Sequence, residues 1–133
     1  MVIRLPVRPE APMPFIHPVT DSGRCVKALV EAETPKNLAA MGSTMSWTAV
    51  CEHLTREFSE QKIKFVFEQV TLTEYEAMVP GPAGAELAAM FQWIDEYGYF
   101  GRDETYVYPK DVSPCYRDRL LVANISSWGL KKR

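Results

Sequence analysis

The sequence predicts an α/β protein of one domain at most, in which short strands alternate with amphipathic helices. Its clearest strand is residues 63–70, IKFVFEQV, where aromatic residues alternate with a mixed set of neighbours. Its clearest helices are residues 46–60 and 82–97, where apolar side chains recur at helical spacing. A chain of 133 residues, 47% of them hydrophobic, can bury one core of ordinary size.

The N-terminal part is expected to be extended before its first helix begins. Residues 1–14 are rich in proline, which removes backbone donors and restrains the preceding residue, so they predict a loop or extended segment. Residues 15–19 predict a short strand. Asp21 is the expected N-cap of a helix over residues 22–33. The predicted buried face of that helix is Val26, Leu29 and Val30.

The middle of the chain predicts a short strand and a strongly amphipathic helix. The strand covers residues 36–41 and ends at Gly42. Ser43, Thr44 and Ser46 are all N-cap candidates for the helix that reaches about residue 60. The apolar stripe of this helix is Trp47, Val50, Cys51, Leu54 and Phe58.

After the strand over residues 63–70, local signals predict two helices in succession. Thr71 and Glu74 have the spacing of a capping box, which opens a short helix that ends before Pro80. The helix over residues 82–97 stops at Gly98. Its expected buried face is Leu87, Met90, Phe91 and Ile94. Residues 105–108 predict a last short strand, and residues 120–130 are compatible with a helix or a poorly ordered tail.

Charge and cysteine content exclude several function classes. A formal net charge of −2 gives no global field that would attract nucleic acid or an anionic membrane. No apolar run approaches the roughly 20 residues that span a bilayer, and the N-terminus lacks the order of a signal peptide. Cys25, Cys51 and Cys115 are odd in number and widely spaced, which favours reduced thiols and a cytoplasmic or nuclear location.

Six motifs occur in an order that is informative as a set. They are Asp21-Ser22-Gly23, Asn37-Leu38-Ala39, Ser46-Trp47, the strand over residues 63–70, Leu72-Thr73-Glu74-Tyr75, and residues 80–101, PGPAGAELAAMFQWIDEYGYFG. This order resembles the C-terminal part of NmrA-like proteins, which are atypical relatives of the short-chain dehydrogenases/reductases. The resemblance covers residues 14–103, between a Pro-rich segment over residues 1–13 and a weakly matched tail over residues 104–133.

The resemblance implies a partial Rossmann-like fold, namely the substrate-side subdomain with short strands and about four helices. Proteins of this family bind a dinucleotide through glycines after their first strand, where the backbone approaches the pyrophosphate. None of the seven glycines here forms such a motif, and Gly81 and Gly84 are explained better by a helix start. The resemblance therefore implies NAD(P) for a full-length form and no cofactor site in this chain alone.

Other catalytic constellations are weak. Tyr106 and Lys110 have the spacing of a short-chain dehydrogenase pair, but Pro109 breaks the helix that would align them. Cys51 and His53 are two residues apart, so on a helix they point in different directions. The set His17, Asp21 and Cys25 lacks further metal ligands of fixed spacing, and capping explains Asp21 better.

By resemblance, two regions are expected to line the substrate cleft. The candidate pocket residues are Phe15, Ile16, His17, Tyr97, Tyr99 and Phe100. The alternative is that the aromatic residues only cover the core, and this alternative is favoured for Phe100. For His17 both interpretations stay open.

Two function classes follow from the sequence. The first is the substrate-side half of an NAD(P)-dependent oxidoreductase scaffold, as a truncated form or a genuine short protein that is not catalytic alone. The second is a non-catalytic regulatory or protein-binding module related to NmrA-type transcriptional regulators. Strands made for a larger parallel sheet leave an open edge, so we expect self-association or docking onto another chain.

Overall fold

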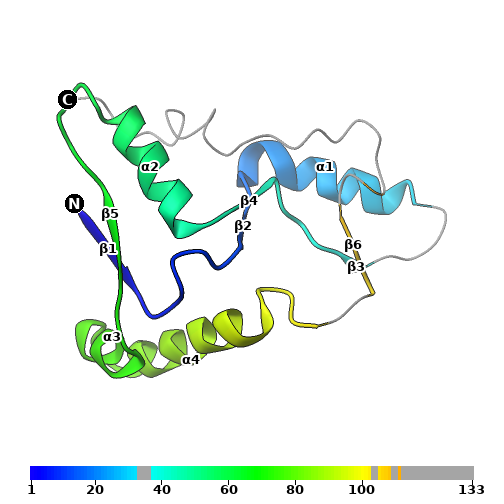
Figure 1. Cartoon of the computed structure of the whole chain (residues 1–133). Coiled ribbons are helices and arrows are strands. Elements are labelled where there is room, and N and C mark those ends of the chain that lie inside the picture. The colour runs from blue at the N-terminus through cyan, green and yellow to red at the C-terminus, as the bar shows by residue number, and fades with distance from the viewer. Residues whose placement is uncertain (33–36, 103–104, 109–110, 112–133) are drawn as a thin grey trace. The chain divides into compact units, whose positions relative to one another are not determined.

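The computed structural model describes residues 1–32, 37–102, 105–108 and 111, which form a mixed α/β arrangement (Figure 1). The described elements, in chain order, are β1 Val2–Leu5, β2 Met13–Phe15, α1 Pro18–Val30, β3 Asn37–Leu38, β4 Ser43–Met45, α2 Trp47–Glu57, β5 Val66–Gln69, α3 Leu72–Met78, α4 Pro82–Tyr97 and β6 Tyr106–Val107. The α/β prediction is confirmed at this level. The helix expected near residues 120–130 lies outside the described residues.

The described strands pair into three sheets of two strands each: β1 with β5, β2 with β4, and β3 with β6. The β1–β5 and β3–β6 pairs are parallel, which requires long crossover connections. The chain divides into two compact units. The first contains Met1–Met13 and Met45–Arg102, and the second contains Pro14–Thr44 and the chain after Arg102.

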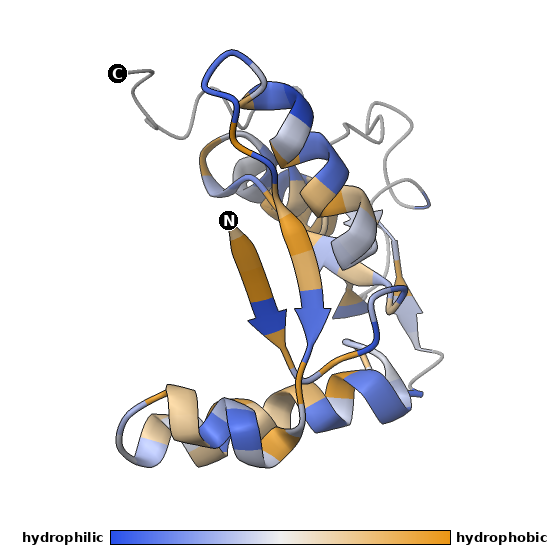
Figure 2. Cartoon of the chain, turned by 60° about the vertical axis from the view of Figure 1, so that its left-hand side comes forward, coloured by the Kyte–Doolittle hydropathy of each residue, from blue (hydrophilic) through white to orange (hydrophobic). Residues whose placement is uncertain are grey.

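In the first unit, β1 and β5 lie side by side; both begin with apolar residues, and β5 ends with hydrophilic ones (Figure 2). The register places Val2 opposite Val66 and Arg4 opposite Glu68, where an ion pair of 2.7 Å joins the two side chains. Of the two conformations predicted for residues 1–14, extended or loop, Val2–Leu5 adopts the extended one and also pairs as a strand. The first proline of the segment, Pro6, comes directly after the last residue of β1.

Helix α2 begins after Ser46, which is one of its three predicted N-cap residues. The hydroxyl of Ser46 accepts a hydrogen bond from the Ala49 amide at 3.2 Å. Val50 and Cys51 are buried, which confirms the centre of the predicted stripe. Ring contacts join the two ends of the helix to the chain of β5: Trp47 stacks on Phe67 at 6.2 Å, and Phe58 meets Phe65 at 5.7 Å.

Helices α3 and α4 begin and end close to their predicted positions. The predicted capping box is confirmed, because the Glu74 carboxylate accepts from the Thr71 amide at 2.8 Å and the Thr71 hydroxyl accepts from the Glu74 amide. The helices pack through Tyr75, whose ring meets Phe91 edge-on at 5.5 Å. They approach so closely that a Cβ on Gly84 would lie 2.6 Å from the Val79 carbonyl oxygen.

The loop after β1 is tied to the end of α4. The backbone amide and the Nε of Arg8 donate to one oxygen of the Asp95 carboxylate at 3.0 and 2.9 Å, and the guanidinium also donates to the Asp95 carbonyl. Beside this contact, Val7 is fully buried. Val7, which precedes the region of family resemblance over residues 14–103, is thus part of the core of the first unit.

In the second unit, α1 begins four residues earlier than the sequence predicts. Its N-cap is His17, whose ring Nδ1 accepts from the Thr20 amide at 3.3 Å, and Pro18 occupies the first helical position that suits proline. The assignment of Asp21 as N-cap is wrong. Asp21 instead lies buried in the first turn, and its carboxylate accepts from the backbone amide of His17 at 2.9 Å.

The buried face of α1 also differs from the prediction. The packed side carries Asp21, Cys25 and Ala28, whereas Val26, Leu29 and Val30 are 59%, 39% and 78% exposed. The packed side has short side chains, which permits a close approach of the chain. Gly42 comes so near that a Cβ there would lie 2.6 Å from an Asp21 carboxylate oxygen. The predicted strand over residues 105–108 is confirmed as β6.

Candidate functional site

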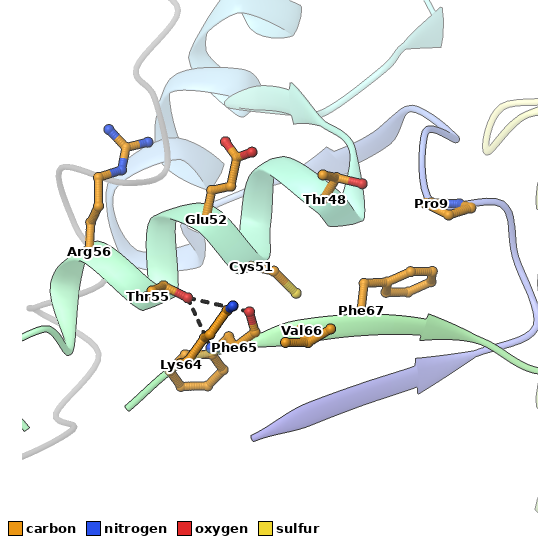
Figure 3. Close-up of a pocket in the computed structure, with 10 residues that line it drawn as sticks. All are labelled: Pro9, Thr48, Cys51, Glu52, Thr55, Arg56, Lys64, Phe65, Val66 and Phe67. Carbon is orange, nitrogen blue, oxygen red and sulfur yellow. Dashed lines mark hydrogen bonds between the residues drawn. The ribbon is translucent and has the colours of Figure 1, made fainter. Parts of the chain in front are cut away.

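The first unit contains an open pocket between α2 and β5, with a volume of about 700 Å³ (Figure 3). Its lining comes from one helix, one strand and one loop. The lining residues are Pro9, Thr48, Cys51, Glu52, Thr55, Arg56, Lys64, Phe65, Val66 and Phe67. The site is therefore built by segments that the crossover between β1 and β5 brings together.

One face of α2 forms the first wall. The five helical lining residues recur at spacings of three and four, so they follow a single stripe along the helix. Cys51 and Thr55 point toward β5, whereas Glu52 and Arg56 point away from it (Figure 3). The wall thus has an uncharged inner part and a charged rim.

Thr55 ties this wall to the chain that leads into β5. Its hydroxyl accepts a hydrogen bond from the Phe65 amide at 2.9 Å and donates to the Phe65 carbonyl oxygen at 3.4 Å. One side chain thereby satisfies both backbone groups of a residue at the start of the strand. The contact fixes the separation of helix and strand at this point.

Aromatic residues form the apolar part of the second wall. Phe65 and Phe67 are half-buried on one side of the strand, where they meet Phe58 and Trp47 of α2. Val66 lies between them and is exposed. The alternation predicted for residues 63–70 is therefore present, and its aromatic side faces the helix.

Two cations stand at one end of the pocket. Arg56 and Lys64 are both exposed, and neither forms an ion pair with any residue that the structure describes. Glu52 is the one carboxylate of the lining. At the other end, Thr48 donates to the Glu10 carboxylate at 2.8 Å, so its hydroxyl proton is already used.

Cys51 contributes apolar surface to the pocket. It is buried and free, and burial raises the pKa of its thiol above the ordinary value, so the neutral thiol predominates at physiological pH. The thiolate is the nucleophilic form, so this cysteine is unsuited to nucleophilic catalysis. This agrees with the expectation that Cys51 belongs to the core.

His53 stands next to the charged rim. Burial lowers its pKa, and the positive charge of Arg56 lowers it further, while Glu52 acts in the opposite direction. The imidazole is therefore neutral at physiological pH and adds no charge beside the two cations.

Three of the predicted pocket residues lie in the second unit. Phe15 ends β2, and its carbonyl accepts from the Gly42 amide at 2.7 Å. Ile16 follows it and is half-buried. His17 uses its ring and its amide in the start of α1, which gives it a structural role that the sequence left open.

The other three predicted residues lie in the first unit, at the end of α4. Tyr97 packs against Trp93 at 4.5 Å and lies under the Arg102 guanidinium at 5.2 Å. Tyr99 is exposed and meets Phe100 edge-on at 5.2 Å. These aromatic residues gather on the surface of the unit, and a shared pocket with residues 15–17 stays a prediction.

Within the described residues, no group of three or more His, Cys, Asp and Glu side chains is placed to hold a metal ion. No helix in the same part of the chain is both long and apolar enough to cross a bilayer.

The sequence contains two signals that would have located the pocket. The spacing of Cys51 and Thr55 puts both on the same side of α2, and the aromatic alternation marks the strand that packs there. Comparisons of the chain with protein-family models, with curated proteins and with solved structures find no match.

Proposed function

We propose that the chain is the substrate-side half of an NAD(P)-dependent oxidoreductase scaffold of the NmrA-like type, and that it is not catalytic alone. In this proposal a Rossmann-like sheet is completed by strands that another polypeptide or segment supplies. The observation that carries the proposal is the parallel pairing of β1 with β5, in a sheet of only two strands among the described residues.

Among the described residues, the edge of this sheet beyond β5 has backbone groups available for a further strand. The amides of Val66 and Val70 donate to carbonyls at the two ends of β1, so alternate residues of β5 point to the opposite edge. Phe67 and Gln69 are those residues, beyond the point where Thr55 satisfies Phe65. Parallel sheets are normally larger and covered on both faces.

Apolar side chains that are exposed on one face of the sheet also support the proposal that further protein covers it. Val2 and Val66 are register neighbours on one face, and they are 50% and 46% exposed. Burying such a cross-strand apolar pair stabilises an assembled sheet. The positions of α2, α3 and α4 further support the family resemblance, because α2 and α3 begin at the predicted caps Ser46 and Thr71 and α4 begins at Pro82 as predicted.

A calorimetric titration with NADPH and NADH tests the cofactor part of this proposal. We expect no binding to the purified chain at millimolar nucleotide, because the glycines of a dinucleotide site are missing from the sequence. A circular dichroism melt of the same sample shows that the protein titrated is folded. Binding in the micromolar range would contradict the proposal, because the chain would then hold a cofactor site of its own.

A protein-binding regulatory module is the second candidate, and one observation favours it. Trp93, Tyr97 and Tyr99 form an exposed aromatic group beside Arg102, a composition enriched at protein interfaces. If this group mediates association, Trp93→Ser abolishes it, whereas Met78→Ser on exposed α3 surface does not. If the sheet edge mediates association, both variants associate like the parent chain.

A further inference from the structure

We propose that helix α1 is a dimerisation element, through which two copies of the chain associate by pairing their α1 helices in antiparallel directions. This inference goes beyond the proposed function, because α1 belongs to the second unit and the β1–β5 sheet belongs to the first. It holds whether or not the chain forms part of an oxidoreductase.

One side of α1 is a continuous apolar row that is exposed. Because successive residues of a helix turn by about 100°, Val19, Gly23, Val26 and Val30 lie along one narrow stripe, which we call the α1 seam. The stripe is opposite the packed side of the helix. Its three valines are 88%, 59% and 78% exposed. Scattered exposed apolar residues are ordinary, whereas a contiguous row marks an interaction surface.

The spacing of the α1 seam suits one partner helix. The steps between its consecutive residues are four, three and four, which is the alternation of a and d positions in a heptad. A strict a/d row is narrower than the face that a helix presents to a globular core. Leu29 borders the row and is 39% exposed. The expected occupant is therefore a single helix with an apolar seam of its own.

The order of side-chain sizes along the seam selects a second copy of α1. Gly23 has open space above it, since no atom lies within 4 Å of a Cβ placed there. In an antiparallel pair centred between Gly23 and Val26, the valine of each helix lies over the glycine of the other. Val19 then lies opposite Val30 at both ends. One patch thus contacts itself reciprocally, as a twofold dimer requires.

The opposite direction of pairing fits the same residues less well. A parallel pair in register would place Gly23 against Gly23 and leave a gap at that layer, where packing contacts are lost. The antiparallel pair also places the positive end of each helix dipole beside the negative end of the other.

The charges beside the seam do not oppose the antiparallel pair. Lys27 flanks Val26, and the residue nearest to it across the pair on the same side is Thr20, so two lysines do not meet. Lys27 also forms an ion pair of 3.7 Å with Glu31 of its own helix.

The size of the contact determines its expected strength. Four layers on a helix of 13 residues bury less than the standard interface area of about 1,600 Å². We therefore expect a reversible dimer whose population rises with protein concentration.

Sedimentation equilibrium from micromolar to millimolar concentration measures this association. Val26→Ser should weaken the dimer at least about tenfold, because each of the two helices loses a buried valine. Arg24→Ser is the control on the same helix, since it places the same serine off the seam, and it should change the dimer little. Both side chains are exposed, so both variants should fold, which a circular dichroism melt checks.

A spin label reports the direction of pairing. It is attached at Glu31→Cys in a Cys115→Ser background, in which Cys25 and Cys51 are buried and protected from the reagent. The labelled chain is mixed with unlabelled ¹⁵N-enriched protein. We expect the strongest intermolecular broadening at the amides of residues 19 and 20, at the start of the partner helix.

Four results would overturn the proposal. They are a parent chain that stays monomeric at millimolar concentration, association of Val26→Ser equal to that of the parent, equal weakening by Arg24→Ser, and broadening centred on residues 30 and 31 or on β1 and β5. Association through the sheet edge would give the second of these results. The NADPH titration measures nucleotide binding, so the proposed function and the α1 dimer can fail separately.

Discussion

The hydroxyl of Thr55 is hydrogen-bonded to both backbone groups of Phe65, accepting from the amide at 2.9 Å and donating to the carbonyl oxygen at 3.4 Å. These part-buried contacts join α2 to the residue before β5. The backbone groups of Phe65 would otherwise be available to pair with a third strand. The Thr55 side chain takes the place of that strand at this one residue. Both Thr55 and Phe65 also line the pocket between α2 and β5.

Thr55→Val should destabilise the first unit, because valine keeps the shape and leaves the Phe65 amide and carbonyl without their partner. A loss of about 1–3 kcal/mol in the free energy of unfolding is expected for such an unsatisfied pair. Urea denaturation followed by circular dichroism measures it. Thr73→Val, at an exposed position of α3, is the control and should change stability little. Equal effects of the two substitutions would show that the junction contributes nothing.

Two glycine-to-alanine substitutions are expected to have opposite signs. In α4, a Cβ on Gly84 would lie 2.6 Å from the Val79 carbonyl and 2.9 Å from the Glu76 carbonyl, so Gly84→Ala should cost about 1–3 kcal/mol through overpacking. In α1, no atom lies within 4 Å of a Cβ on Gly23. Gly23→Ala should therefore stabilise its helix by about 0.5–1 kcal/mol.

Thermal melts of the two alanine variants provide the measurement. A stabilising effect of Gly84→Ala would mean that helix propensity outweighs the close α3–α4 packing. The description of that packing would then be wrong.

The capping box of α3 should make stability depend on pH. The Thr71 amide and then its hydroxyl lower the pKa of the Glu74 carboxyl. A carboxyl with a lowered pKa in the folded state stabilises the protein above its unfolded value, and this contribution is lost as the pH falls through the folded value. The stability difference between the parent chain and Glu74→Gln should therefore shrink on acidification from neutral pH.

Urea titrations of the capping-box variant at several pH values measure that difference. Thr73→Val, at an exposed position of the same helix, removes no titrating group, so it serves as the control and should keep a constant difference. A Glu74→Gln difference that does not change between neutral and acidic pH would rule out the capping interaction as its source.

Cys51 should resist thiol reagents in the folded protein. Its pKa is raised by burial, so the folded state disfavours the thiolate, and stability should fall as the pH rises above the unfolded value of about 8.5. In a Cys25→Ser, Cys115→Ser background, the rate of reaction with Ellman's reagent should be low in buffer and rise sharply in urea. A native rate close to the urea rate would show that the thiol is exposed as thiolate.

Elements with local signals were predictable from the sequence, and those decided by distant contacts were not. The boundaries of α3 and α4 follow from a capping box, from Pro82 and from Gly98, all of which lie next to the helix they limit. Strand β1 was missed because its partner residue Glu68 is 64 residues away from Arg4. No local signal marks such a pairing.

The buried face of α1 was also not predictable from the local sequence. The apolar spacing of Val26, Leu29 and Val30 indicated a core face, yet the packed side carries Asp21, Cys25 and Ala28. The chain at Gly42 lies against Asp21, and helical spacing along α1 does not contain that information. The pocket was missed for a related reason, since its lining joins a helix, a strand and a loop.

The proposal that β1 and β5 belong to a larger sheet can be tested on a single sample of the purified chain. Light scattering gives the mass of the purified chain at micromolar concentration, and hydrogen exchange compares the amides of β1 and β5 with those of α4. We expect either a mass above that of the monomer or a monomer whose β1 and β5 amides exchange much faster than those of α4. A clean monomer with equally protected strands and helix would contradict it.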